Sequence, residues 1–268
     1  MQQADLIVQG YESAKKQNAS PAEYLQDQIT PLVLGGVTSE LYSLSHKLIR
    51  LFPDDENCWF CIGCYYWTVN KLDLAQKYVR RALKKNKSFA MAWILLGHIY
   101  SANEETEQAL SSYRTAIRLL PNHKLPLLCL SKELIHSGNY WLAAHMLQSA
   151  RLIDPQDILI LNEMALIAVK LGNLGQAENI LRKAIGSIDM HQMNSIAFCE
   201  VSCSLLSFLS HSPSDFLSIQ IIYNYATVLR KLGHLEQALL WFERCLRLNR
   251  HKVWSLVAMG FTLHLMRR

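Results

Sequence analysis

Apolar side chains recur along this chain in short runs separated by polar turns, and within a run they keep the spacing of one helix face. Acidic residues gather near the starts of the runs and basic residues near their ends, which complements helix dipoles. The pattern predicts paired helices at 56–69 and 72–85, 90–102 and 106–119, 124–137 and 140–153, and 158–171 and 174–187. It therefore indicates an all-α protein.

The stretch from Ala92 to Pro121 has the most regular pattern. Its large and small residues stand at the positions that define a tetratricopeptide repeat (TPR), a helix–turn–helix unit of about 34 residues. These residues are Trp93, Leu96, Gly97, Tyr100, Ala109, Tyr113, Ala116 and Pro121. Gly97 and Ala109 are both small, and we expect the two helices to cross there at close range.

The same positions recur when the template is moved along the chain by its own period. Counting Trp93 as the fourth position of its unit, the same position falls at Trp59, Leu127 and Leu161, and at Ile222 after an insertion. Each unit of such an array stacks only on its neighbours. The predicted fold is a right-handed TPR superhelix, an α-solenoid of stacked antiparallel helix pairs.

We expect a single solenoid over residues 1–268, with strong repeats at about 56–189 and 219–252, partial repeats at both ends and an insertion at about 187–218. Within the insertion, Ile196–Leu209 is apolar enough for an additional helix, and residues 212–214 mark a turn. Gly138 and Gly172 fall in turns between paired helices, where a positive φ suits glycine.

Both ends are predicted to lie partway through a unit. Met1–Ser20 resembles a lone second helix, and Val253–Arg268 a lone first helix. Between them and the strong repeats we expect Pro21–Leu34, capped by Ser20, and a helix at 40–51, capped by Ser39. Because terminal repeats normally have a polar cap, these ends imply a covering partner or a truncated relative of a longer protein.

Composition limits the possible classes of protein. Half of the residues are apolar and 18% are charged, which excludes a disordered chain. The sequence has neither an apolar run of membrane-spanning length nor a secretory start, so neither a membrane nor secretion is indicated. The seven cysteines are an odd number and sit mostly within helices, so we interpret them as free thiols in an intracellular, reducing compartment.

The net charge of +5 comes from scattered basic residues, densest over residues 80–87. A solvated outer helix face explains this group better than nucleic-acid binding, because no DNA- or RNA-binding motif accompanies it.

The residues offer no catalytic centre and no cofactor site. Cys58, Cys61 and Cys64 have a suggestive spacing, but on a helix they drift around the surface, and no fourth metal ligand lies nearby. The glycines near Gly172 lack the strand and the third glycine of a phosphate-binding loop. His98 is expected to contact a ligand or to pack, rather than to act as a general base. We predict that the protein is not an enzyme and binds no metal.

The first helices of a TPR array line a concave groove, and here that lining is mostly apolar. The candidate groove residues are Phe60, Cys64, Trp67, Ile94, His98, Leu128, Lys132, Asn162, Tyr223 and Arg230. An exposed apolar surface of this size is expected to hold an extended peptide or protein segment. The alternative is that tight curvature buries these side chains against one another. The few polar members are scattered, which disfavours a clamp for a carboxyl terminus.

Several short sequence motifs resemble those of one TPR family, the cell-division-cycle-sixteen type scaffold subunit of the anaphase-promoting complex. This complex, also called the cyclosome, is a multi-subunit ubiquitin ligase. The motifs are residues 40–48 (ELYSLSHKL), Trp59-Phe60, residues 63–66 (GCYY), Ala92-Trp93, Gly97-His98, Gln108-Ala109, Ala116, Leu125-Pro126 and Asn162-Glu163. Several of them, such as Ser45-His46-Lys47, are not required by the TPR template.

The resemblance implies a non-catalytic scaffold in nucleus and cytoplasm. It implies as partners the other cyclosome TPR subunits and a small accessory subunit whose terminal segment lies in the groove, with His98 and Asn162 as contact residues. Family members also form homodimers through N-terminal repeats, and the absence of those repeats here argues against a homodimer. No contact with nucleic acid or a membrane is implied.

Two other classes of function stay open. A free-standing adaptor or co-chaperone would capture peptide tails transiently, and a dependence of that binding on Lys132 would favour it. An accessory array of an enzyme, such as a glycosyltransferase, would need a catalytic domain, which the sequence lacks.

Overall fold

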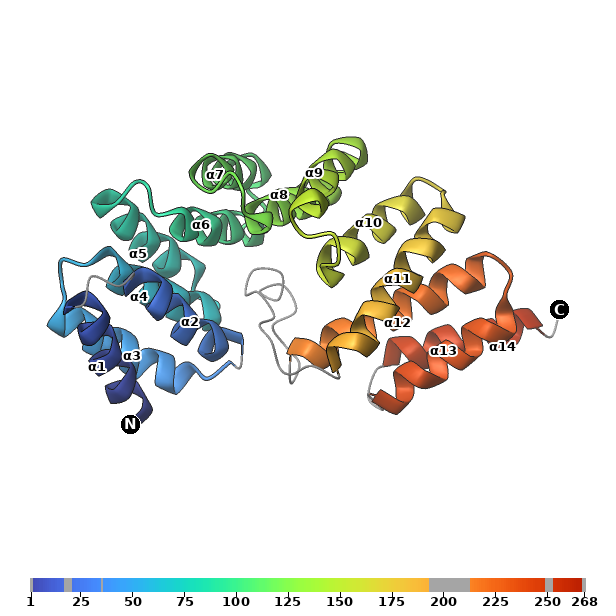
Figure 1. Cartoon of the computed structure of the whole chain (residues 1–268), viewed down its shortest axis with the longest axis horizontal. Helices are drawn as coiled ribbons and strands as arrows, with labels where there is room; N and C mark the ends of the chain where they lie inside the picture. The colour runs from blue at the N-terminus through green and yellow to red at the C-terminus, as the bar shows by residue number, and fades with distance from the viewer. Residues whose placement is uncertain (1, 17–20, 35, 193–212, 249–252, 267–268) are drawn as a thin grey trace. The chain divides into compact units, whose positions relative to one another are not determined.

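The computed structural model describes residues 2–16, 21–34, 36–192, 213–248 and 253–266, and all regular structure in these ranges is helical (Figure 1). The helices are α1 (Gln2–Lys16), α2 (Pro21–Leu34), α3 (Thr38–Leu51), α4 (Glu56–Thr68), α5 (Leu72–Lys85), α6 (Ala90–Ala102), α7 (Thr106–Leu119), α8 (Lys124–His136), α9 (Tyr140–Ile153), α10 (Ile158–Lys170), α11 (Leu174–Gln192), α12 (Pro213–Lys231), α13 (Leu235–Leu248) and α14 (Val253–Met266). The all-α TPR fold is confirmed.

The described residues form two compact units. The first contains α1–α7 and α8 as far as Glu133, and the second contains the rest of α8 and α9–α14. Within the first unit, α4 packs on α5 and α6 packs on α7. Within the second, α10 packs on α11 and α12 packs on α13. These are the antiparallel pairs that the repeat predicts, while a single solenoid through all 268 residues stays a prediction.

The predicted helix bounds between residues 56 and 174 are confirmed to within one residue. The region of the insertion differs, because α11 continues to Gln192 and α12 already begins at Pro213. The turn predicted at residues 212–214 is therefore wrong for Pro213 and Ser214, which form the first turn of α12, where proline is favoured. The helix expected at 196–209 lies outside the described residues.

Glycine allows close crossing of paired helices at two equivalent repeat positions. A Cβ atom on Gly97 would overlap the ring of Tyr113 on α7, and a Cβ atom on Gly63 would come within 2.5 Å of Val79 Cγ2 on α5. Real Cβ atoms do not approach other heavy atoms so closely. The predicted crossing at Gly97 is confirmed.

Turns between paired helices contain one residue with positive φ. Gly138 (φ 80°) and Gly172 (φ 82°) confirm the sequence prediction. In the two earlier pairs, Asn70 (φ 58°) and Glu104 (φ 61°) take the same place. Glutamate is unusual there because its Cβ is crowded in the left-handed region.

Fewer helix starts have the expected side-chain cap than the sequence suggests. Asp157 accepts hydrogen bonds from the backbone nitrogens of Leu159 (2.7 Å) and Ile160 (3.2 Å) at the start of α10. The cap predicted at Ser39 is wrong, because α3 already begins at Thr38 after Val37, which makes no side-chain capping bond. Ser20 lies outside the described residues.

Candidate protein-binding surface

The candidate groove residues are mostly buried within the chain. Phe60, Cys64, Trp67, Ile94, His98, Leu128 and Asn162 are buried, and Lys132, Tyr223 and Arg230 are partly exposed. The rings of Phe60 and Phe89 pack edge to face, with centroids 5.1 Å apart. The expectation of an exposed apolar lining at these positions is therefore corrected: their own chain covers them. Contact with a partner at these residues stays a prediction.

His98 joins three helices of the first unit. Its Nδ1 lies 2.8 Å from the hydroxyl of Tyr113 on α7, and its Nε2 lies 3.8 Å from Cys129 Sγ on α8. Burial lowers the pKa of His98 to about 3, and the positive charge of Lys132 contributes in the same direction. The imidazole is thus held neutral and acts as a packing residue, which is one of the two roles expected from the sequence.

The buried His98 makes stability depend on pH. Since its pKa falls from an ordinary 6.5 to about 3 on folding, the unfolded chain takes up a proton that the folded chain excludes, and stability is lost as the pH falls from about 6.5 toward 3. We expect His98 alone to lower the free energy of unfolding by about 2 kcal/mol between pH 7 and pH 5. Urea unfolding at both pH values should show a smaller drop for His98→Gln. An equal drop in both proteins would contradict this linkage.

In the second unit the candidate residues also make internal contacts. Asn162 Oδ1 on α10 accepts a hydrogen bond of 2.8 Å from Asn224 Nδ2 on α12. The ring centroid of Tyr223 lies 5.8 Å from that of Phe242 on α13. The guanidinium of Arg230 lies 5.2 Å from the ring of Phe261 on α14. The sequence placed these residues at groove positions but could not identify their partners.

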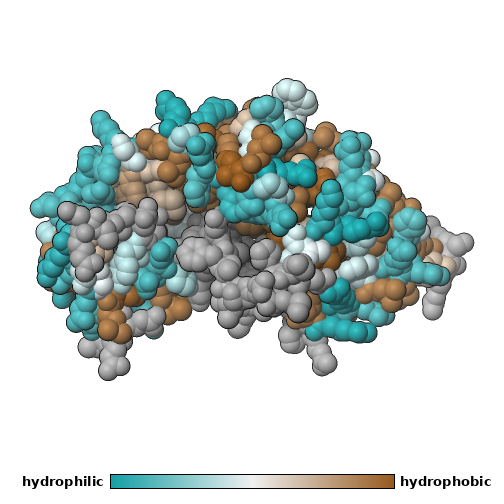
Figure 2. Space-filling view, viewed as in Figure 1, coloured by the Kyte–Doolittle hydropathy of each residue, from teal (hydrophilic) through white to brown (hydrophobic). Residues whose placement is uncertain are grey.

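Exposed apolar side chains occur instead along α14. Trp254 (76% exposed), Val257 (65%) and Phe261 (54%) stand at the groove positions of the last repeat, and Leu256 and Leu263 are also exposed. Figure 2 shows hydrophobic residues at the surface in the region of α13 and α14. Gly260 has no atom within 4 Å of where a Cβ would be, unlike Gly63 and Gly97 at the same repeat position. These residues of α14 are exposed, whereas most of the candidate groove residues are buried.

The cysteines of α4 are buried free thiols. Cys58, Cys61 and Cys64 form no disulfide, and burial raises the pKa of Cys58 to about 12 and the pKa values of the other two well above the ordinary value. Such thiols are poor nucleophiles and poor metal ligands because both roles need the thiolate. Among the described residues no cluster of metal-ligating side chains occurs.

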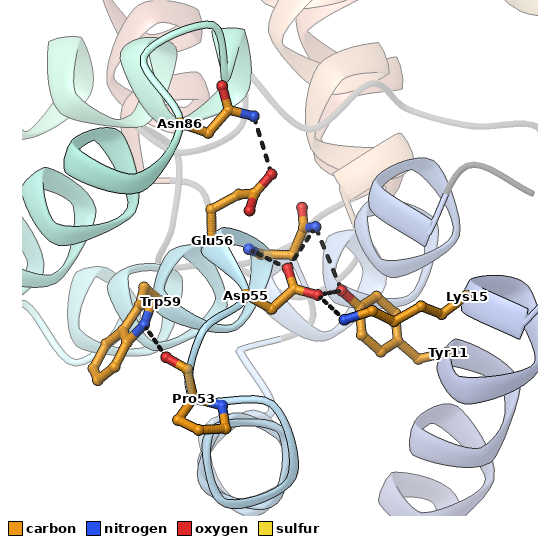
Figure 3. Close-up of polar contacts among 8 residues, drawn as sticks. Tyr11, Lys15, Pro53, Asp55, Glu56, Trp59 and Asn86 are labelled. Carbon is orange, nitrogen blue, oxygen red and sulfur yellow. Dashed lines mark hydrogen bonds and ion pairs between the residues drawn. The ribbon is translucent and has the colours of Figure 1, made fainter. Parts of the chain in front are cut away.

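A polar cluster that the sequence analysis missed ties α1 to the start of α4 (Figure 3). The Tyr11 hydroxyl donates to Asp55 Oδ2 at 2.7 Å, and Lys15 Nζ donates to the same atom at 2.9 Å. The Asn57 backbone and side chain both donate to Asp55 Oδ1. Burial opposes ionisation of Asp55, but these hydrogen bonds outweigh it and hold its pKa below the ordinary value. Asp55 thus caps α4 and links it to α1.

No helix in the described ranges is both long and apolar enough to cross a membrane.

Models of the tetratricopeptide repeat match residues 62–124, and also 159–188 and 219–252. Anaphase-promoting complex subunit 6 of Arabidopsis thaliana is 30% identical over 232 residues, which cover 86% of this chain and 38% of that protein. The cell division cycle protein 16 homolog of Homo sapiens is 26% identical over 278 residues, which cover 91% and 42%.

Among solved structures, the crystal structure of the APC/C hetero-tetramer Cut9-Hcn1 is similar, with a TM-score of 0.74 and 23% identity over 92% of this chain and 46% of that one. The resemblance drawn from the sequence is confirmed. The chain spans less than half the length of these relatives.

Proposed function

We propose that this chain is a non-catalytic scaffold subunit of the anaphase-promoting complex, which holds partner subunits in fixed geometry through its TPR surfaces. The observation that carries the proposal is the similarity to anaphase-promoting complex subunit 6 of Arabidopsis thaliana over 86% of the chain. The cell division cycle protein 16 homolog of Homo sapiens is similar over 91% of it. Its place of action in this proposal is the nucleus and the cytoplasm, as the family resemblance implies.

The local chemistry supports a scaffold. Several groups that could take part in catalysis are used in packing: His98 is a neutral link between helices, the thiols of α4 are protonated, and Asp55 is a cap. Helix pairs locked by close crossings form a rigid support, which suits a protein that positions others.

We propose two kinds of partner, the other TPR subunits of the complex and a small accessory subunit that contributes an extended segment. The structurally similar Cut9 was solved as a hetero-tetramer with a second protein, Hcn1. On this chain we assign the segment to the exposed side of α14, because Trp254, Val257 and Phe261 form an apolar stripe at groove positions. Homodimerisation is not part of the proposal.

Affinity purification of the tagged chain from its own cells, followed by mass spectrometry, tests this function. We expect other subunits of the complex to co-purify, and their absence would refute the proposal. The double variant Trp254→Asp, Phe261→Asp should lose the accessory subunit. Leu152→Asp on α9, where the leucine is 83% exposed, is the matched control and should retain it. Binding of free peptide tails that depends on Lys132, without the complex, would favour an adaptor instead.

A further inference from the structure

The outer face of α5 is a continuous basic surface. Lys77, Arg80, Arg81 and Lys84 are exposed and follow one another at helical spacings of three and four residues. At roughly 100° per residue these four side chains project from about a third of the helix circumference. The one carboxylate of this helix, Asp73, lies in its first turn.

Two of the four cations are held in place by aromatic rings. Arg80 Nη2 donates a hydrogen bond of 2.6 Å to the hydroxyl of Tyr100. The guanidinium of Arg81 lies 3.6 Å above the ring of Trp59, which is itself stacked with Tyr78. A guanidinium that rests on a ring keeps the N–H groups at its edge available. Because these side chains are already ordered, a ligand that binds them loses less conformational entropy.

The two lysines of this face are not neutralised within the described part of the chain. Lys85, at the end of α5, pairs with Asp54 at 2.7 Å. No ion pair with a carboxylate of the described residues involves Lys77 or Lys84. The surface therefore keeps a local positive charge of about four, and α5 offers only Asp73 to offset it.

The equivalent positions of the other second helices differ. The outer positions of α7 hold Ser111, Arg114, Thr115 and Arg118, and those of α9 hold His145, Gln148, Ser149 and Leu152. The repeat fold therefore does not require four cations in this place. A surface that the fold does not explain is a candidate for recognition.

We infer that the outer face of α5 binds an acidic segment, rich in Asp and Glu, of a partner protein. Carboxylates match the two ordered guanidinium groups because they accept paired N–H bonds along the guanidinium edge. Single-stranded nucleic acid fits less well, because it also needs free ring faces on which bases stack. Here Trp59 is buried and its ring is covered by Arg81, and Tyr78 is stacked with both Trp59 and Tyr66.

Binding of a short fluorescein-labelled peptide of alternating Asp and Glu to the full chain, followed by fluorescence anisotropy, tests this inference. We expect Lys77→Glu with Lys84→Glu to weaken binding roughly tenfold, since two attractive contacts become repulsive. Neither lysine makes an ion pair with a described residue that the fold would lose. Arg81→Lys keeps the charge but loses the planar guanidinium with its paired N–H donors, and should weaken binding several-fold.

The matched control is Arg114→Glu with Arg118→Glu on α7, which changes the net charge by the same amount on the outer face of the next second helix. It should leave the peptide affinity nearly unchanged. An equal loss in both double variants would reduce the effect to net charge and overturn the inference. So would tighter binding of a single-stranded oligonucleotide than of the peptide at equal salt, or no measurable binding of the peptide at low salt.

Discussion

Replacing Gly97 with leucine is expected to lower the free energy of unfolding by about 3 kcal/mol, at the upper end of the cost of overpacking. A Cβ atom there would lie 2.7 Å from Cδ1 and 2.8 Å from Cζ of Tyr113. That ring cannot move aside easily, because it is buried and its hydroxyl lies 2.8 Å from His98 Nδ1. The larger side chain must push α6 and α7 apart, which also weakens the contact with His98.

Gly260→Leu is the matched control for this prediction. Gly260 occupies the same repeat position on α14, where nothing lies within 4 Å of the new Cβ. Because leucine favours a helix over glycine, this change should leave stability unchanged or raise it by up to about 1 kcal/mol. Urea unfolding followed by circular dichroism measures both variants. Equal effects of the two substitutions would mean that close crossing at Gly97 does not contribute to stability.

Phe242→Ala is expected to cost about 3–5 kcal/mol, the usual range for a buried phenylalanine. Phe242 on α13 is fully buried in the core of the second unit, together with Leu181, Tyr225 and Leu229. Its removal takes a large apolar surface from the core and leaves a cavity among three helices that cannot close without moving α13.

Leu240→Ala on the same helix is the control for Phe242→Ala. Leu240 is 66% exposed, so its truncation should change stability by less than about 0.5 kcal/mol. Thermal unfolding of the wild type and of both variants compares them directly. A small effect of Phe242→Ala would show that α13 does not fold as part of this core.

Local structure was predictable where neighbouring residues determine it. The helix bounds of α4 to α10 follow from apolar spacing and from turn residues within a few positions. The crossing at Gly97 follows from the repeat, because a small residue at that position of a TPR lets the two helices cross at close range. The errors at Ser39 and Pro213 also concern local choices, in which one cap or helix start competes with another a residue or two away.

Exposure of the candidate groove residues was not predictable in this way. The sequence placed Phe60, Ile94 and His98 on the concave side of their helices, and the structure buries them. Whether such a side chain meets solvent depends on residues far away in the chain, as with His98, Tyr113 and Cys129 on three different helices. The resemblance to cyclosome subunits could nevertheless be recognised from the sequence, because it depends on short sequence motifs and not on the solvent exposure of side chains.

The amino-acid sequence by itself determined the helices, their pairing and the family resemblance, since each depends on side-chain size and polarity at short, regular spacings. Only the tertiary structure decided that His98 is neutral and internal, that Asp55 ties α1 to α4, and that α14 is open. The physical reason is that desolvation and hydrogen bonding depend on the whole surroundings of a group, and those surroundings come together only when distant helices pack.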